Sequence, residues 1–244
     1  MLVTTRGIVL HTFKYNDESL VAEVLTETEG VVSFMVHISH SPRAAVRYTL
    51  FRPLALLEFS WNVRPGGGIQ RPKSVQVAMP LCSIPFDPYK TTMALFLAEF
   101  LRSAVKVETD AGPLFEYIFD SIVWLDTCRE GYANFHLVFL LRLARFLGFE
   151  PNLENASPGA YFDLEASQFT FFLPTHRHYL PPVDAARLPL LMRMNFGTMH
   201  LFRFSGSERS RLLEYINIYY RLHLPDFPEM KSLAVLKELF DAGR

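Results

Sequence analysis

His176 and His178 are separated by a single residue in a stretch that also contains prolines. On a β-strand, side chains two positions apart face the same way, so this pair could supply two imidazole ligands to a metal ion. No cysteine lies nearby, and the nearest acidic residue downstream is Asp184. Two ligands do not make a site, and loop histidines beside prolines are commonly ordinary surface residues. We therefore expect no bound metal.

Other residue types that carry catalysis do not form a known arrangement. His37 and His40 lie near two serines, but no strand–turn–helix elbow or orienting acid accompanies them at the required spacing. Residues 66–68 are three glycines without the Gly-Lys-Ser/Thr ending of a phosphate-binding loop, so a hairpin loop explains them better. No two acidic residues have a spacing that indicates a general acid and a general base. The sequence predicts a protein that is not an enzyme and needs no cofactor.

Positive charge is concentrated in one part of the chain. Between positions 43 and 73 there are six basic residues and one acid, Glu58. Tyr48, Phe51 and Trp61 are interleaved with them. A surface that binds single-stranded nucleic acid combines cations for the phosphates with rings for the bases. The alternative, which the spacing leaves open, is a solvated rim with some core aromatic residues.

A second basic group surrounds residues 205–208. Their sequence, Ser-Gly-Ser-Glu, is typical of a helix start with Ser205 or Ser207 as the capping residue. A helix N-terminus flanked by arginines could hold a phosphate. The alternative is an ordinary exposed first turn, in which Glu208 and Glu214 offset the arginines. The arginines concerned are Arg203, Arg209, Arg211 and Arg221.

The chain as a whole has no charge that would attract nucleic acid or an acidic membrane. Its 244 residues include 24 Lys and Arg against 25 Asp and Glu, a formal net charge of −1. Half of the residues are hydrophobic and 14% are aromatic, which excludes disorder. No stretch has the roughly 18 apolar residues that cross a bilayer, and no signal peptide is evident. We expect a folded, cytoplasmic protein that does not bind a membrane.

The N-terminal third is rich in β-branched and aromatic residues, with turn signals at Asn16-Asp17, at Glu29-Gly30 and at the three glycines. Five strands over about 80 residues favour a small antiparallel barrel, and the five-stranded OB-fold is the commonest fold of that description. The predicted strands are residues 7–10, 20–26, 31–38, 54–59 and 73–78.

Helical spacing replaces alternation after residue 88. Three apolar helices are predicted over residues 93–101, 114–125 and 137–147, and Gly148 stands where a helix commonly stops. Residues 150–182 contain an alternation typical of an inserted two-stranded hairpin, and helical spacing returns over residues 184–194, 206–222 and 229–240. The sequence thus predicts an α+β fold, with an OB-fold barrel over residues 1–80 and a helical domain over residues 81–244 that contains the β-hairpin.

Three parts of the chain resemble the RecO family of bacterial recombination mediators. Residues 4–10 (TTRGIVL), 15–21 and 25–30 resemble its N-terminal OB-fold pattern. Residues 139–151 (FLLRLARFLGFEP) resemble a helix that ends in Gly-aromatic-x-Pro, and residues 219–224 with 230–236 resemble the family's C-terminal close. Each part alone is a weak signal, but the three in this order are fairly specific.

The resemblance implies a DNA repair and recombination mediator that is associated with the nucleoid. Such a protein binds single- and double-stranded DNA through the barrel and anneals complementary strands. It contacts RecR and the acidic, apolar C-terminal tail of single-stranded-DNA-binding protein. It helps to load RecA onto strands that are covered by single-stranded-DNA-binding protein. Trp61 is a candidate to stack on a base. The residues expected to contact phosphates are Lys14, Arg43, Arg47, Arg52, Arg64, Arg71 and Lys73. The candidates for the carboxylates of the tail are Arg142, Arg145 and Arg221.

One departure from the family concerns zinc. Many members carry a four-cysteine zinc module just after the Gly-aromatic-x-Pro segment, whereas residues 152–159 here contain no cysteine. We expect the hairpin within residues 150–182 to replace that module, without zinc. The main alternative to the mediator function is a non-catalytic interaction scaffold whose OB-like barrel binds proteins and not DNA.

Overall fold

The computed structural model describes residues 1–38, 48–63, 68–105 and 111–242. The chain forms two compact units, Met1–Thr127 and Cys128–Arg244. The first unit holds five strands followed by two long helices, and the second holds the remaining helices and a small sheet. Residue 80, the predicted domain boundary, lies within the first unit between its strands and its helices.

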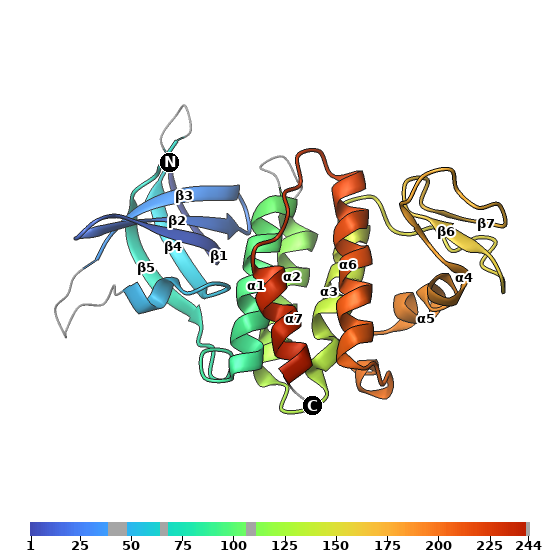
Figure 1. Ribbon diagram of the computed structural model, residues 1–244. Coiled ribbons are helices and arrows are strands. Elements are labelled where there is room, and N and C mark those ends of the chain that lie inside the picture. The colour runs from blue at the N-terminus through green and yellow to red at the C-terminus, as the bar shows by residue number, and fades with distance from the viewer. Residues whose placement is uncertain (39–47, 64–67, 106–110, 243–244) are drawn as a thin grey trace. The chain divides into compact units, whose positions relative to one another are not determined.

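An antiparallel sheet with the strand order β3-β2-β1-β4-β5 forms the N-terminal part of the first unit (Figure 1). The central strand β1 pairs with β2 along its C-terminal half and with β4 along its N-terminal half. The predicted five-stranded OB-fold is confirmed. The strands are β1 (Leu2–Asn16), β2 (Ser19–Thr26), β3 (Gly30–His37), β4 (Leu56–Asn62) and β5 (Pro72–Met79).

The barrel is not closed, which differs from the prediction. Within the described residues, β3 and β5 share no strand ladder, and a single parallel bridge joins Phe34 to Gln70. The backbone N–H of Met35 donates to Gln70 O, and the backbone N–H of Gln70 donates to Ser33 O, both at 2.8 Å. β5 begins two residues later at Pro72, which has no N–H to donate, so this pairing does not extend into β5 at that residue.

Aromatic side chains fill the interior of the sheet. Phe34 and Phe59 are stacked with their ring centroids 4.6 Å apart, and Trp61 meets Phe34 edge-on at 5.0 Å. All three are almost completely buried. They pack with the inward-facing aliphatic residues of β1, β2 and β3 into one core cluster.

Two helices, α1 (Pro88–Ala104) and α2 (Ala111–Thr127), complete the first unit. The side chain of Asp87 caps α1 by accepting from the backbone N–H groups of Tyr89 and Lys90. α1 packs against β1, and Arg102 on α1 forms an ion pair with Glu23 on β2. Both helices match their predicted positions.

The second unit is built on α3 (Phe135–Phe146), which packs against α6 (Gly206–His223). α7 (Ser232–Ala242) lies along α6, as Figure 1 shows. The hydroxyl of Tyr220 on α6 donates to Leu140 O on α3 at 2.7 Å. α3 stops where the sequence predicts, because Gly148 adopts a left-handed conformation with φ 85°.

The inserted segment has three strands where two were predicted. β6 (Tyr161–Asp163) pairs with β7 (Gln168–Thr170) as expected, and on its other edge it pairs with β8 (Tyr179–Leu180). β8 was missed because two residues are too few to show an alternation. A core cluster that includes Phe162, Leu180 and Tyr219 supports this small sheet.

One predicted helix, residues 184–194, is broken into α4 (Pro182–Ala185) and α5 (Leu188–Arg193). Pro189 has no N–H to donate to Ala185 O, so α4 cannot continue through this position. A new helix, α5, begins at Leu188. Three short 3₁₀ segments complete the described elements: η1 (Tyr48–Phe51), η2 (Tyr132–Asn134) and η3 (Met199–Leu201). Among the described helices, none is long and apolar enough to cross a membrane.

Candidate nucleic-acid interface

A groove of about 540 Å³ lies on the first unit where the β1–β2 turn, β3 and the start of β5 come together. We call it the strand-end groove. Its lining is divided between polar and apolar side chains. The lining residues that could meet a ligand include Tyr15, Ser19, Met35, His37, Arg71 and Lys73.

The register of the sheet explains why residues distant in the sequence meet here. Asn16 pairs with Ser19 across the tight β1–β2 turn, and Ser19 pairs with His37 at the end of β3. The bridge between Phe34 and Gln70 then holds the segment before β5 against β3. Arg71 and Lys73 therefore face the same opening as His37 and Tyr15. OB-folds bind oligonucleotides at this position, on the β2–β3 face and its flanking loops.

The electrostatic character of the groove is positive. Arg71 and Lys73 are both exposed, and no acidic residue is among the described side chains that line the groove. Tyr15 adds a ring that is 63% exposed. Cations beside an exposed ring are what a phosphate backbone and an unpaired base require of a binding surface.

Both parts of the chain match a known protein family. Residues 1–80 match the family described as Recombination protein O N terminal, and residues 85–233 match Recombination protein O C terminal. The chain belongs to the RecO family. A DNA repair protein RecO of Bacteroides fragilis is 53% identical over 99% of this chain and 100% of its own length. A DNA repair protein RecO of Phocaeicola vulgatus is 49% identical over 98% of this chain and 100% of its own length. A DNA repair protein RecO of Azobacteroides pseudotrichonymphae is 37% identical over 99% of this chain and 100% of its own length.

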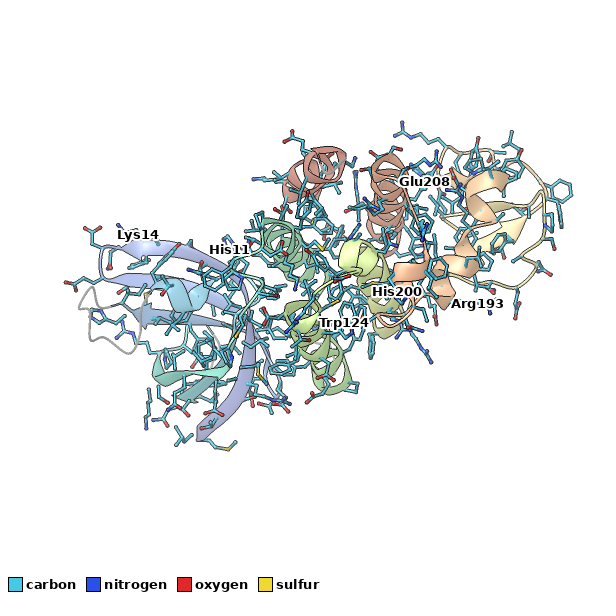
Figure 2. The ribbon with its side chains drawn as sticks, turned by 90° about the horizontal axis from the view of Figure 1, so that it is seen from below. His11, Lys14, Trp124, Arg193, His200 and Glu208 are labelled. Atoms are coloured by element: carbon cyan, nitrogen blue, oxygen red, sulfur yellow. The ribbon has the colours of Figure 1, made fainter. Side chains whose placement is uncertain are left out.

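The phosphate-binding residues expected of a RecO protein fall into four groups. Arg71 and Lys73 line the strand-end groove. Lys14 lies one residue before Tyr15 and is exposed on the sheet (Figure 2). Its Nζ pairs with Asp17 Oδ1 at 2.6 Å. Arg52 lines a different, mainly apolar groove beside η1. The other three, Arg43, Arg47 and Arg64, lie outside the described residues.

The expected stacking role of Trp61 is wrong. Its side chain is 1% exposed and packs on Phe34, so it cannot reach a base. Phe51 is 2% exposed and also belongs to the core. Trp61 was misassigned because the neighbouring charges suggested a surface, whereas its strand position turns it inward.

The sequence interpretation did not consider Tyr15 or His37 as candidate DNA contacts. Both are exposed and both line the strand-end groove. A signal for Tyr15 was present, because Phe13 and Tyr15 alternate just before the predicted turn at Asn16-Asp17. The predicted strand ended at residue 10, whereas β1 extends to Asn16. For His37, only the pairing of β2 with β3 brings the residue to the groove.

The basic group around residues 205–208 forms an ordinary helix start. Ser205 and Glu208 make a reciprocal capping box at the N-terminus of α6. Arg187 pairs with Glu208 at 2.8 Å, and Arg211 pairs with Asp184 at 3.0 Å. These contacts occupy the helix end where a phosphate would bind, and they favour the alternative of a capped first turn.

The three arginines considered for a partner's tail are exposed on the second unit. Arg142 and Arg145 lie one turn apart on α3, and Arg221 lies near the end of α6. Arg145 is 3.9 Å from Glu150, a loose ion pair. Their role in a RecO protein stays a prediction.

Proposed function

We propose that this member of the RecO family is a recombination mediator that binds single- and double-stranded DNA at the strand-end groove. Bound DNA strands would then be annealed to complementary strands. The protein would also help to load RecA onto strands covered by single-stranded-DNA-binding protein. It acts by binding and not by catalysis, and DNA binding would associate it with the nucleoid.

The observation that carries this proposal is the placement of Arg71, Lys73 and Tyr15 around one opening. The sequence as a whole is nearly neutral, so affinity for DNA must come from a local surface. The strand-end groove provides that surface at the position where OB-folds commonly bind oligonucleotides.

The test is a titration of a fluorescently labelled single-stranded oligonucleotide, followed by anisotropy at several salt concentrations. The wild type is compared with the double variant Arg71→Glu/Lys73→Glu. We expect the variant to bind more weakly. Its logarithmic salt slope should be smaller by about 1.4, since each phosphate contact with single strands contributes about 0.7.

The matched control is Arg129→Glu/Arg193→Glu, which changes the net charge by the same amount. Both of these arginines are exposed and both belong to the second unit. This variant should bind DNA as the wild type does. Equal weakening in the two variants would attribute binding to overall charge and would refute a site at the groove.

The salt series also separates the mediator from a protein-interaction scaffold. Affinity that depends on phosphates falls steeply with salt, whereas a mainly apolar protein interface responds weakly. A wild type that binds no oligonucleotide at low salt would leave the scaffold as the better proposal.

Annealing is tested with two complementary labelled strands mixed with the protein at fixed salt. The wild type should accelerate duplex formation, and Arg71→Glu/Lys73→Glu should not. Tyr15→Ala, which removes a ring and no charge, should weaken binding of the single strand more than binding of the duplex, because only unpaired bases offer their faces for stacking.

A further inference from the structure

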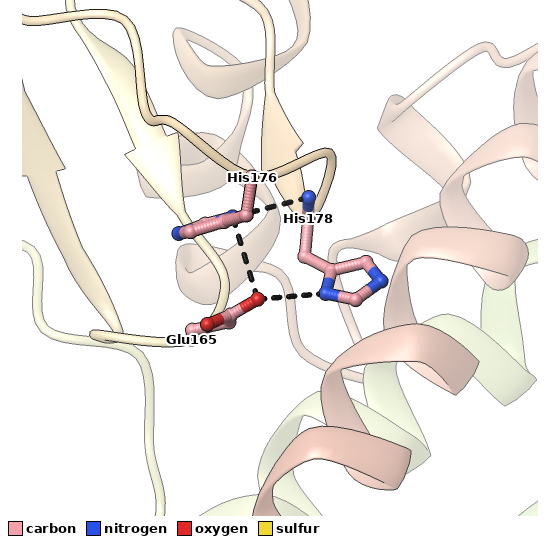
Figure 3. A group of neighbouring side chains, drawn as sticks. All are labelled: Glu165, His176 and His178. Atoms are coloured by element: carbon pink, nitrogen blue, oxygen red, sulfur yellow. Dashed lines mark hydrogen bonds and ion pairs between the residues drawn. The ribbon is translucent and has the colours of Figure 1, made fainter.

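Two histidines and a glutamate converge on one face of the inserted segment (Figure 3). Nδ1 of His178 lies 2.8 Å from Glu165 Oε1, and Nδ1 of His176 lies 3.4 Å from the same oxygen. All three ligand atoms lie within 4.8 Å of one another. The side chains are 28%, 32% and 43% exposed for His176, His178 and Glu165, so an ion from solvent could reach them.

The backbone holds this cluster in place. Asp163 pairs with Tyr179, and the backbone N–H of Leu164 donates to His178 O at 3.0 Å, which extends the β6–β8 pairing as far as the histidine. Asp163 Oδ1 accepts from the backbone N–H groups of Glu165 and Ala166 and so fixes the turn that presents Glu165. Leu164 is buried beneath the turn.

Asp163 also orients His176. Its other oxygen, Oδ2, lies 3.3 Å from Nε2 of His176. Nδ1 of His176 accepts from the backbone N–H of His178 at 3.2 Å, so the ring proton belongs on Nε2, facing the carboxylate. A histidine that binds a metal through one ring nitrogen commonly donates its other N–H to a carboxylate, which fixes the tautomer and the direction of the free nitrogen.

Two carboxylates approach His176. Oδ2 of Asp163 lies 3.3 Å from its Nε2, and Oε1 of Glu165 lies 3.4 Å from its Nδ1. A cation bound by this group would offset the acidic charge. Its bond to Nδ1 of His176 would replace the hydrogen bond that this atom accepts from the backbone N–H of His178.

We propose that Glu165, His176 and His178 form a site for a divalent transition-metal ion, with Zn²⁺ as the preferred ion and Asp163 as its positioning residue. Imidazole nitrogens favour Zn²⁺ and its neighbours over Mg²⁺ or Ca²⁺, which take oxygen ligands. Three protein ligands leave one tetrahedral position for water. The sequence-based argument against a metal counted two ligands, and the pairing of β6 with β8 supplies the third.

The ion would tie the β6–β7 turn to the segment that leads into β8. These two parts of the insertion are also joined by short backbone pairing, by the histidine contacts and by the core cluster that includes Leu164 and Leu180. Because the ion binds the folded arrangement, it would raise the thermal midpoint of unfolding. The ligand set contains no cysteine and therefore differs in chemistry from a four-cysteine module.

The test uses tag-free, full-length protein with the substitutions Cys82→Ser and Cys128→Ser, so that neither a histidine tag nor a thiolate contributes. Protein stripped with a chelator is titrated with Zn²⁺ in competition with a chromophoric chelator. Co²⁺ is then added as a spectroscopic probe of ligand geometry. We expect one ion per chain, a tetrahedral Co²⁺ absorption spectrum and a higher thermal midpoint with Zn²⁺. Affinity should fall as the pH is lowered, because protons compete for the imidazole nitrogens.

Three variants assign the site. Glu165→Gln and His178→Ala should lose the bound ion and its effect on the thermal midpoint. Asp163→Asn should keep the stoichiometry of one ion per chain and weaken the affinity by about 10- to 100-fold. Substitution of a residue that hydrogen-bonds to a metal ligand commonly has an effect of this size. The control is His200→Ala, an exposed histidine of the same unit outside the cluster, and it should bind as the parent protein does (Figure 2).

Two results would overturn the proposal. One is a parent protein that binds Zn²⁺ no better than Glu165→Gln, and the other is a control that loses the ion to the same degree. Circular dichroism of each metal-free variant shows whether it folds. If His178→Ala does not fold, the decision rests on Glu165→Gln, which keeps the size of the side chain and removes only its charge.

Discussion

His136 is a single buried residue that makes the stability of the second unit depend on pH. It lies on α3 with 0% of its surface exposed. Burial, and after it the positive charge of Arg209, lowers the pKa of His136 from 6.5 to about 3. The unfolded chain therefore binds a proton in a pH range where the folded chain does not. Stability from this residue is complete above about pH 6.5 and is lost as the pH falls from 6.5 towards 3.

We predict that His136→Leu makes unfolding less dependent on pH. Between pH 6.5 and 4.5, His136 lowers the free energy of unfolding by up to about 1.4 kcal/mol per pH unit. The variant should lack this contribution. Urea unfolding at a series of pH values measures it, and the control is His200→Leu at an exposed position. If both variants keep the slope of the wild type, another group controls the acid sensitivity.

A second residue-scale feature links the connection after β5 to the end of α2. The carboxylate of Asp126 accepts backbone N–H groups from Cys82 at 2.7 Å and from Ser83 and Ile84 at 2.8 Å. Burial raises the pKa of Asp126, but these three hydrogen bonds outweigh it and the pKa is lowered. One acidic side chain thereby fixes the segment from which α1 begins.

At the scale of the element, β1 is the strand on which the sheet depends. It pairs with both β2 and β4, and Gly7 lies where the two pairings overlap. A Cβ at this position would lie 2.5 Å from Val24 Cγ1 and 3.1 Å from the ring of Phe59. Both neighbours are fully buried, and the β-branched Val24 has little freedom to move away.

We predict that Gly7→Ala destabilises the sheet by about 1–3 kcal/mol, the range for overpacking a filled core. Chemical unfolding of the full chain measures the loss. Gly112→Ala is the control, because a Cβ there meets nothing within 4 Å and the residue lies in α2. That change should be neutral or stabilising, since alanine favours a helix. A Gly7→Ala variant as stable as the wild type would show that the strands adjust around the added methyl group.

At the scale of the whole molecule, the basic surfaces considered for DNA and for a partner protein lie on different units. Arg71 and Lys73 belong to the first unit, and Arg142 and Arg145 belong to the second. The near-zero net charge means that neither surface acts through a general field. Substitutions in one unit should leave the function of the other unchanged.

We predict that the two activities can be lost separately. Arg142→Glu/Arg145→Glu should weaken binding of an acidic, apolar C-terminal peptide by about tenfold or more, since a charged hydrogen bond contributes about 1.5–3 kcal/mol. It should leave oligonucleotide binding unchanged, and Arg71→Glu/Lys73→Glu should show the reverse. Anisotropy with labelled peptide and labelled DNA measures both in the same samples. Simultaneous loss of both activities in either variant would contradict separate surfaces.

The sequence by itself determined most of the elements and their order, apart from β8 and the break between α4 and α5. Strand positions in the first 80 residues and the three apolar helices that follow were predictable because alternation and helical spacing are local properties of the chain. The same holds for the stop at Gly148 and for a capped helix start at Ser205 or Ser207, which depend on a few adjacent residues. The structure assigns the cap to Ser205. Family membership was also accessible, because it is carried by short segments in a fixed order.

Only the tertiary structure decided which residues meet. Tyr15 and His37 reach Arg71 through strand pairing, and Glu165 reaches His176 and His178 because β6 pairs with β8. Trp61 turned inward for the same reason, although its neighbours in sequence suggested a surface. Local patterns report the conformation of a segment, but a site depends on register and on long-range pairing, which one-dimensional spacing does not contain.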